Sequence, residues 1–132
     1  METLRIGTET EFVSIELQGG FSEEGWIETR AEIVVDGFRA DVRSWFHRYD
    51  FENFEVSLRE LYRTLKGPVK LEQLSGQLKF ELNVNISGHV HLTGEARSGW
   101  DNRLTFEIGM DQSYLPETLR QLRSILEASV MS

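Results

Sequence analysis

Apolar and polar side chains alternate strictly over residues 78–86, and this alternation limits the possible folds more than any other feature. Its even positions are apolar and its odd positions polar, in the run Leu78-Lys79-Phe80-Glu81-Leu82-Asn83-Val84-Asn85-Ile86. Successive side chains of a strand point to opposite faces, so this run predicts a β-strand with one apolar and one polar face. The same period predicts strands over residues 13–17, 27–35, 38–46, 90–96 and 104–110, and a shorter one over 69–71.

Tight turns separate these strands. Asp36-Gly37 lies between Val35 and Phe38, the first apolar residue of the next run, and Asp-Gly favours a two-residue hairpin. Ser87-Gly88 follows Ile86 in a similar way, and residues 19–24 and 99–102 resemble longer hairpin loops. Strands joined in this way are antiparallel.

Two segments have helical spacing instead. Phe51, Phe54, Leu58, Leu61 and Leu65 recur at intervals of three and four residues. Asp50 is expected to cap this helix and Gly67-Pro68 to end it. A second helix is expected from about Pro116 to Leu126, with one apolar stripe as well.

Together these patterns predict an α+β fold in the order strands, helix, strands, helix. We expect a single domain over residues 1–132, in which both helices pack on one face of one antiparallel sheet of about six strands. Residues 57–61 and 118–122 resemble each other (SLREL and TLRQL). This similarity fits either an internal duplication or two ordinary amphipathic helices.

Composition excludes several classes of protein. The chain has no cysteine, which excludes disulfides, thiol catalysis and thiolate metal sites. The first residues lack the basic and apolar stretches of a signal peptide, and no apolar run approaches the roughly 20 residues of a membrane span. We therefore expect a cytoplasmic protein with no membrane partner.

Charge is distributed unevenly. Residues 1–36 contain nine acidic and two basic side chains, whereas the rest of the chain is nearly neutral. An acidic field repels nucleic acid and attracts basic partners. We therefore expect a protein partner, for which a basic domain is one candidate, and no nucleic acid.

His89 and His91 are the best candidates for a metal pair, because residues two apart on a strand share a face. A zinc site needs a third protein ligand, for which Glu81 or Glu95 is available. The same positions also fit the polar face of an ordinary amphipathic strand. That second interpretation is preferred, so we expect no metal and no cofactor.

Tryptophans occur at polar-face positions. Trp26 is in register with Glu24, Glu28 and Glu32, and Trp45 with Arg43 on the following strand. Exposed tryptophan beside charge is common in binding hot spots, although such a residue can instead cover a sheet edge or pack under a loop. The candidate partner-binding residues are Glu24, Trp26, Glu28, Glu32, Arg43 and Trp45.

Catalytic templates are missing from the sequence. It contains no phosphate-binding glycine loop, no nucleophile elbow and no EF-hand loop. Acidic pairs such as Glu23-Glu24 are expected by chance among 22 acidic residues. We therefore expect no catalytic residue.

The stretch from Val35 to Leu126 resembles a family of small bacterial proteins that includes the WapI-type immunity proteins. The resemblance rests on five segments: GFRADV at 37–42, the apolar positions of 51–65, GQLKF at 76–80, GHVHL at 88–92, and Leu104-Phe106 leading into DQSYL at 111–115.

The resemblance implies a non-enzymatic protein that binds a contact-dependent toxin domain and blocks it, with no catalytic motif to carry over. Two alternatives remain at this point. The chain is compatible with a structural or regulatory homo-oligomeric subunit, and less well with a metal-dependent enzyme that uses His89 and His91.

Overall fold

The computed structural model describes residues 2–73 and 76–131 of the chain. These residues form eight β-strands, two α-helices and one short 3-10 helix. Their bounds, in chain order, are β1 (Thr3–Gly7), β2 (Phe12–Leu17), β3 (Trp26–Val35), β4 (Phe38–His47), α1 (Arg48–Thr64), β5 (Val69–Glu72), β6 (Leu78–Val84), β7 (His89–Ser98), β8 (Asn102–Asp111), η1 (Gln112–Tyr114) and α2 (Leu115–Met131).

The strands form two sheets rather than one. Sheet A has the order β1-β2-β3-β4 and sheet B the order β5-β6-β7-β8, and every neighbouring pair is antiparallel. The predicted α+β class and the order of elements are confirmed, but the prediction of one six-stranded sheet is wrong. Alternation identifies strands without saying which ones pair, and α1 separates β4 from β5 so that each half of the chain closes its own sheet.

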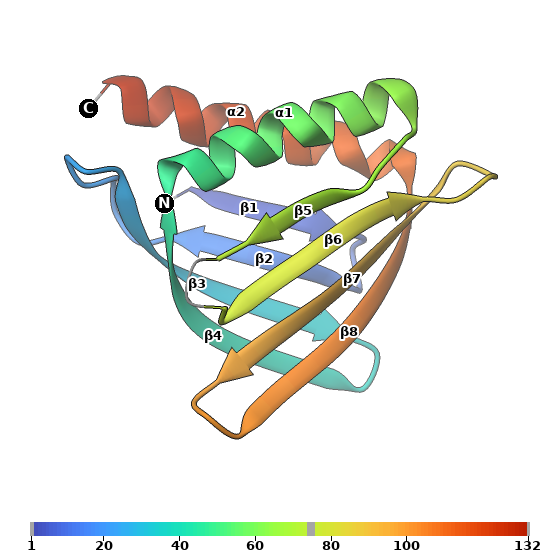
Figure 1. Cartoon of the computed structure of the whole chain (residues 1–132), viewed down its shortest axis with the longest axis horizontal. Helices are drawn as coiled ribbons and strands as arrows, with labels where there is room; N and C mark the ends of the chain where they lie inside the picture. Colours follow the sequence, from blue (N-terminus) through green and yellow to red (C-terminus); the bar gives the residue numbers. More distant parts are fainter. Residues whose placement is uncertain (1, 74–75, 132) are drawn as a thin grey trace.

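Figure 1 shows the two helices side by side above the sheets, with sheet A behind and sheet B in front. Helix α1 contacts β5, and α2 contacts β1. One hydrophobic cluster draws side chains from both sheets and both helices, with the largest fully buried residues Phe46, Phe51, Phe54, Leu4, Ile6, Ile15, Ile27, Ile33, Leu58, Leu61, Leu78 and Leu82. The apolar faces of the sheets therefore share a single core with the helices.

Two apolar residues at turns are exposed, contrary to the alternation. The predicted two-residue turn at Asp36-Gly37 is confirmed, and Gly37 has the positive φ of +81° that such turns require. Phe38 directly follows this turn and is 65% exposed, and Ile86 is fully exposed because β6 ends at Val84. The alternating sequence pattern therefore continues to Phe38 and Ile86, but their side chains are exposed at the turns instead of buried in the core.

Helix α1 begins earlier than its sequence predicts. The N-cap is His47, whose Nδ1 accepts a hydrogen bond from the Tyr49 backbone N–H at 3.1 Å. Asp50, the predicted cap, instead occupies the third helical position and accepts from the His47 backbone N–H at 2.8 Å. The two side chains complete a capping box. The predicted second helix is confirmed, one residue earlier than Pro116.

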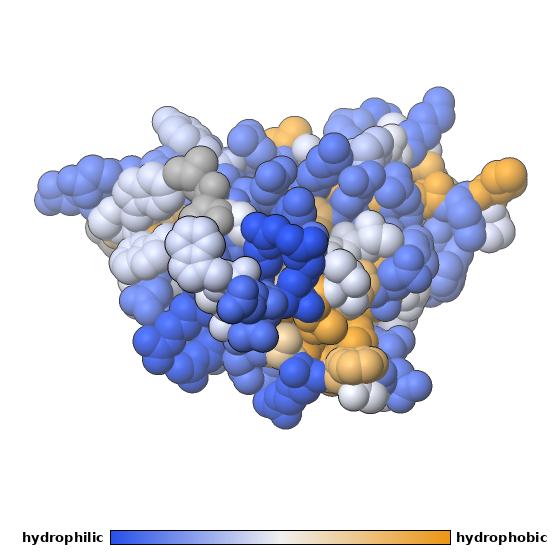
Figure 2. Space-filling view, turned by 60° about the horizontal axis from the view of Figure 1, so that its bottom comes forward, coloured by the Kyte–Doolittle hydropathy of each residue, from blue (hydrophilic) through white to orange (hydrophobic). Residues whose placement is uncertain are grey.

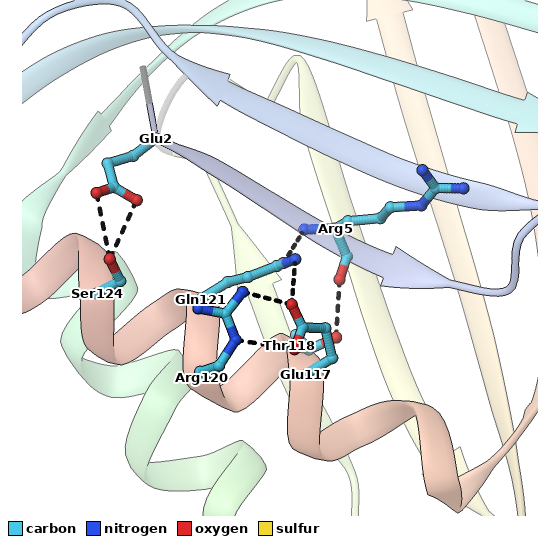
Figure 3. A network of polar contacts seen from close by, with 7 residues as sticks. All are labelled: Glu2, Arg5, Glu117, Thr118, Arg120, Gln121 and Ser124. Atoms are coloured by element: carbon cyan, nitrogen blue, oxygen red, sulfur yellow. Dashed lines mark hydrogen bonds and ion pairs between the residues drawn. The ribbon is translucent and has the colours of Figure 1, made fainter.

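Side chains of α2 cover the free edge of β1 (Figure 3). Thr118 Oγ1 donates to the Arg5 carbonyl at 2.7 Å, and the Arg5 backbone N–H donates to Gln121 Oε1 at 2.7 Å. Further along the helix, Ser124 Oγ donates to the Glu2 carboxylate. An uncovered strand edge invites pairing with another chain, so these contacts protect one edge of sheet A.

A buried carboxylate joins the two helices. Glu55 on α1 is only 8% exposed, and its Oε1 lies 3.6 Å from Arg59 Nη1 and 3.7 Å from Arg123 Nε on α2. A charge taken out of water requires a partner of opposite sign. The shared carboxylate therefore favours the side-by-side arrangement of α1 and α2.

Glycine is required at one interior position of sheet B. Gly94 on β7 lies between Phe80 on β6 and Phe106 on β8 in the strand register. A Cβ atom at this position would lie 2.5 Å from the Phe106 ring and 2.9 Å from Phe80 Cβ. The ring of Phe106 therefore occupies the space that a side chain at position 94 would need.

We expect Gly94→Ala to lower the free energy of unfolding by about 1–3 kcal/mol, the usual cost of overpacking a core. Gly20→Ala is the control, because a Cβ there meets nothing within 4 Å. Urea denaturation measures both variants. Equal stability of the Gly94 variant and the wild type would show that Phe106 moves aside freely.

The β1–β2 turn is linked to η1 by one side-chain hydrogen bond. Tyr114 Oη donates to Glu9 Oε2 at 2.8 Å. This bond, more than the nearby Arg5 charge, lowers the pKa of the Glu9 carboxyl, and it raises the pKa of the Tyr114 hydroxyl. A carboxyl whose pKa is lower in the folded state stabilises the fold above its unfolded pKa, and that contribution disappears as the pH falls through the folded pKa.

We therefore expect Tyr114→Phe to be less stable than the wild type at pH 7, with the difference shrinking below about pH 4.5. The measurement is the free energy of unfolding across this pH range. Glu9→Gln is the matched variant, since it removes the titrating group and should show a smaller change with pH than the wild type. A deficit of Tyr114→Phe that stays constant with pH would contradict this assignment.

Candidate functional site

The β3–β4 hairpin positions most of the predicted partner-binding residues on one surface. This surface is the outer face of sheet A, meaning the polar face of β2, β3 and β4. The register places Glu28 opposite Trp45, Arg30 opposite Arg43, and Glu32 opposite Asp41. Trp26, Glu28, Glu32, Arg43 and Trp45 therefore lie together, while Glu24 precedes β3 in an exposed loop.

Four rings gather at the end of this face where β3 begins and β4 ends. This aromatic corner consists of Trp26, Trp45, His47 and Tyr49. The Trp26 and His47 rings meet edge to face with centroids 4.9 Å apart, and His47 stacks on Tyr49 at 4.7 Å. Trp45 is 53% exposed and Tyr49 is 65% exposed, whereas Trp26 is half-buried. Trp26 thus has a packing role, and Trp45 and Tyr49 offer the free aromatic surface.

His47 holds the aromatic corner in place. Its Nδ1 accepts from the Tyr49 N–H, so the neutral ring carries its proton on Nε2, which donates to the Glu24 carbonyl at 2.7 Å. Gly25 runs directly past this ring with a φ of +92°, and a Cβ there would lie 2.7 Å from His47 Nε2. The loop before β3 and the start of α1 are therefore fixed to the same imidazole.

Charges of both signs cover the rest of the face. Arg30, Arg39 and Arg43 interleave with the carboxylates of β3 and β4, and Arg39 forms an ion pair with Glu32. The acidic excess of residues 1–36 is divided among several regions, because Glu2 faces α2 and Glu9 faces η1. The outer face of sheet A is therefore a mixed-charge surface with an aromatic end, although residues 1–36 are mainly acidic.

This face has a surface depression that is lined by Glu16, Arg30, Glu32, Arg39, Asp41, Val42 and Arg43. Figure 2 shows one side of the molecule, which is mainly hydrophilic, with apolar side chains in several separate places. A broad surface of exposed aromatic and charged groups suits contact with another protein.

The histidine pair lies on the other sheet. His89 and His91 are exposed on β7, and His91 Nε2 lies 3.8 Å from Glu107 Oε2. Glu81 and Glu95, the proposed third ligands, form other contacts: Glu81 accepts from Asn83, and Glu95 pairs with Arg97 and Arg103. Within residues 2–73 and 76–131, no group of three or more His, Cys, Asp or Glu side chains is arranged to hold a metal ion.

Sequence reasoning missed Tyr49 as part of the site. Tyr49 precedes the first predicted helical residue, so the sequence did not assign its side chain to a face of a strand or helix. Its ring stacks on that of His47 because α1 begins at Arg48. Alternation did place His47 on the polar face of its strand, but the ring stacking that joins it to Trp26 depends on the turn from β4 into α1.

Comparison with solved structures finds six matching chains. One belongs to the crystal structures of Trypanosoma bruciei MRP1/MRP2, with a TM-score of 0.57 and 8% identity over 98% of this chain and 87% of that chain. At this identity the similarity concerns the fold alone. A search of curated proteins finds no match, and neither described helix has the length and apolarity of a membrane span.

A family comparison gives a match over nearly the whole chain. The model of the immunity protein WapI-like family aligns with residues 3–129, which includes both sheets and both helices. The match extends beyond the resemblance found from residue 35 onward and includes the N-terminal strands β1, β2 and β3. This protein therefore belongs to the WapI-like immunity protein family.

Proposed function

We propose that this protein is an immunity protein that binds a bacterial toxin domain and blocks it. The observation that carries the proposal is the family match over residues 3–129. In this proposal residues 1–132 act as one cytoplasmic domain, which catalyses no reaction and uses no cofactor, metal, membrane or nucleic acid.

We assign toxin binding to the outer face of sheet A and its aromatic corner. Trp45 and Tyr49 have exposed rings, and their backbones belong to a strand and a helix rather than to a loop. Rigid, exposed aromatic side chains supply contact area at a low cost in conformational entropy. Arg43 and Glu28 next to Trp45 provide the charged rim that such anchors usually have.

A basic partner remains the best fit to the whole molecule. The formal net charge is −8, so a cationic toxin domain is attracted from a distance. Close contact has a different requirement, because Arg30, Arg39 and Arg43 lie among the carboxylates of this face. The partner surface must therefore present both acidic and basic groups to this face.

The proposal predicts that a secreted toxin is encoded beside this gene, and co-expression with the domain of that toxin tests it. We expect the protein to restore growth of cells that express the toxin domain, and the two purified proteins to form a stoichiometric complex. Rescue without a complex would show that the protein acts by another route and would contradict the proposal.

Trp45→Ala should weaken the toxin complex by about 30-fold, because a hot-spot aromatic contributes about 2 kcal/mol. Trp100→Ala is the matched control, since Trp100 is also exposed but lies in the β7–β8 turn. Surface plasmon resonance measures both affinities. Equal affinities of the two variants would exclude Trp45 from the interface.

Glu28→Lys combined with Glu32→Lys should slow association with a basic toxin domain and leave dissociation less affected, because long-range charge acts mainly on encounter. The effect should shrink as salt is added. Stopped-flow fluorescence at two salt concentrations measures it. Association that is indifferent to salt and to this double variant would place these carboxylates outside the binding route.

A further inference from the structure

Charges on the outer face of sheet A form stripes that cross β3 and β4. Going along the hairpin, the register gives four successive rows, which are Glu28 with Trp45, Arg30 with Arg43, Glu32 with Asp41, and Val34 with Arg39. In the same order, the rows carry one negative charge, two positive charges, two negative charges and one positive charge. Like charges therefore face each other directly across both central rows.

Directly opposed like charges destabilise an antiparallel pair unless a counter-charge bridges them. Sheet B provides the comparison, because Arg97 and Arg103 are also opposed, and Glu95 Oε1 lies 3.0 Å and 3.4 Å from their Nε atoms. In sheet A the register places Glu16 of β2 on the other side of Arg30, but no ion pair joins the two side chains. No described side chain bridges Arg30 to Arg43 or Glu32 to Asp41. Among the described residues Arg39 pairs with Glu32, but no side chain forms an ion pair with Arg30, Arg43 or Asp41.

The order of the stripes is self-complementary. Consider a two-fold axis in the plane of the face, between the two central rows and perpendicular to the strands. Rotation about this axis reverses the order of the rows. It places β3 over β3 of the second copy and β4 over β4 of the second copy. Arg30 then faces Glu32 of the second copy, and Arg43 faces Asp41. In the outer rows Trp45 faces Arg39, a pairing that cation–π attraction favours.

We propose that the protein forms a two-fold symmetric dimer through the outer face of sheet A, in which each copy neutralises the other's charged rows. Isologous contacts of this kind occur twice in a dimer, so every complementary pair counts double. Three exposed charges that lack a partner within the described part of the chain thereby gain one. Arg30, Asp41 and Arg43 are exposed and line a surface depression, so a second copy can reach them.

This dimer does not rest on the proposed toxin binding, although it uses the same face. If both are correct, toxin and second copy exclude each other, and only the monomer neutralises toxin. An interface made largely of exposed ion pairs is weak and sensitive to salt. We therefore expect the dimer to dissociate on dilution into monomers that can bind toxin.

Sedimentation velocity of the free protein tests the proposal, at concentrations from about 1 µM to about 1 mM, a range suited to weak reversible interfaces. We expect a monomer–dimer equilibrium at low salt that shifts toward monomer at high salt. A wild-type protein that stays monomeric throughout, or a dimer that high salt leaves intact, would overturn the proposal.

A charge swap tests the specific pairing. Arg43→Asp brings two carboxylates face to face across the axis, and Asp41→Arg brings two guanidinium groups face to face, so each single variant should lose the dimer. The double variant Asp41→Arg/Arg43→Asp restores opposite charges across the axis and should dimerise again. Failure of the double variant to recover, while its circular dichroism matches the wild type, would contradict the assigned symmetry.

Lys79→Asp is the matched control, because it makes the same change in net charge as Arg43→Asp at an exposed position of sheet B. It should dimerise like the wild type. Dimer loss in this variant as well would mean that net charge alone controls association, which would contradict the assigned pairing. Toxin binding, measured by dilute titration where the free protein is monomeric, reports separately on the proposed function.

Discussion

The packing of two one-sided sheets onto a shared core is the constraint on which the rest of the structure depends. Each sheet has one apolar face, and exposing that face to water would cost far more than the net stability of a small domain. Two helices of 17 residues each do not have enough surface to cover the apolar faces of both sheets. The sheets therefore cover part of each other, and the helices close the remaining side beside β1 and β5 (Figure 1).

This arrangement repeats one unit, four antiparallel strands followed by a helix, within the chain. The short similarity between residues 57–61 and 118–122 falls at matching places in the two units, because Leu58 and Leu61 pack from α1 as Leu119 and Leu122 pack from α2. All four side chains are buried. The two units differ outside the core, since the aromatic corner depends on the junction of β4 and α1.

Much of the fold could be predicted from sequence, because local periods report local geometry. Alternation identified β2, β3, β4 and the four strands of sheet B, and three-four spacing identified both helices. Strand β1 was missed because only Leu4 and Ile6 mark it. The division into two sheets was missed because pairing is a long-range property that no local pattern contains. The candidate site shows the same limit more sharply: alternation placed Trp26 and Trp45 on a polar face, but the count of acidic residues over 1–36 did not show which charges share that face. A sequence count ignores the neighbouring strand, and the arginines of β3 and β4 change the sign of every second row.

The two faces of sheet A differ in how their polar groups are paired. On the inner face Thr29 and Ser44 are buried and hydrogen-bonded to each other at 3.0 Å, so even the polar groups there are satisfied within the chain. On the outer face Arg30 and Arg43 oppose each other, and neither forms an ion pair with a carboxylate of the described residues. Glu16 of β2 lies on the other side of Arg30 in the register without forming an ion pair with it. In the proposed toxin complex and in the proposed dimer, carboxylates of the second molecule would lie against these two arginines.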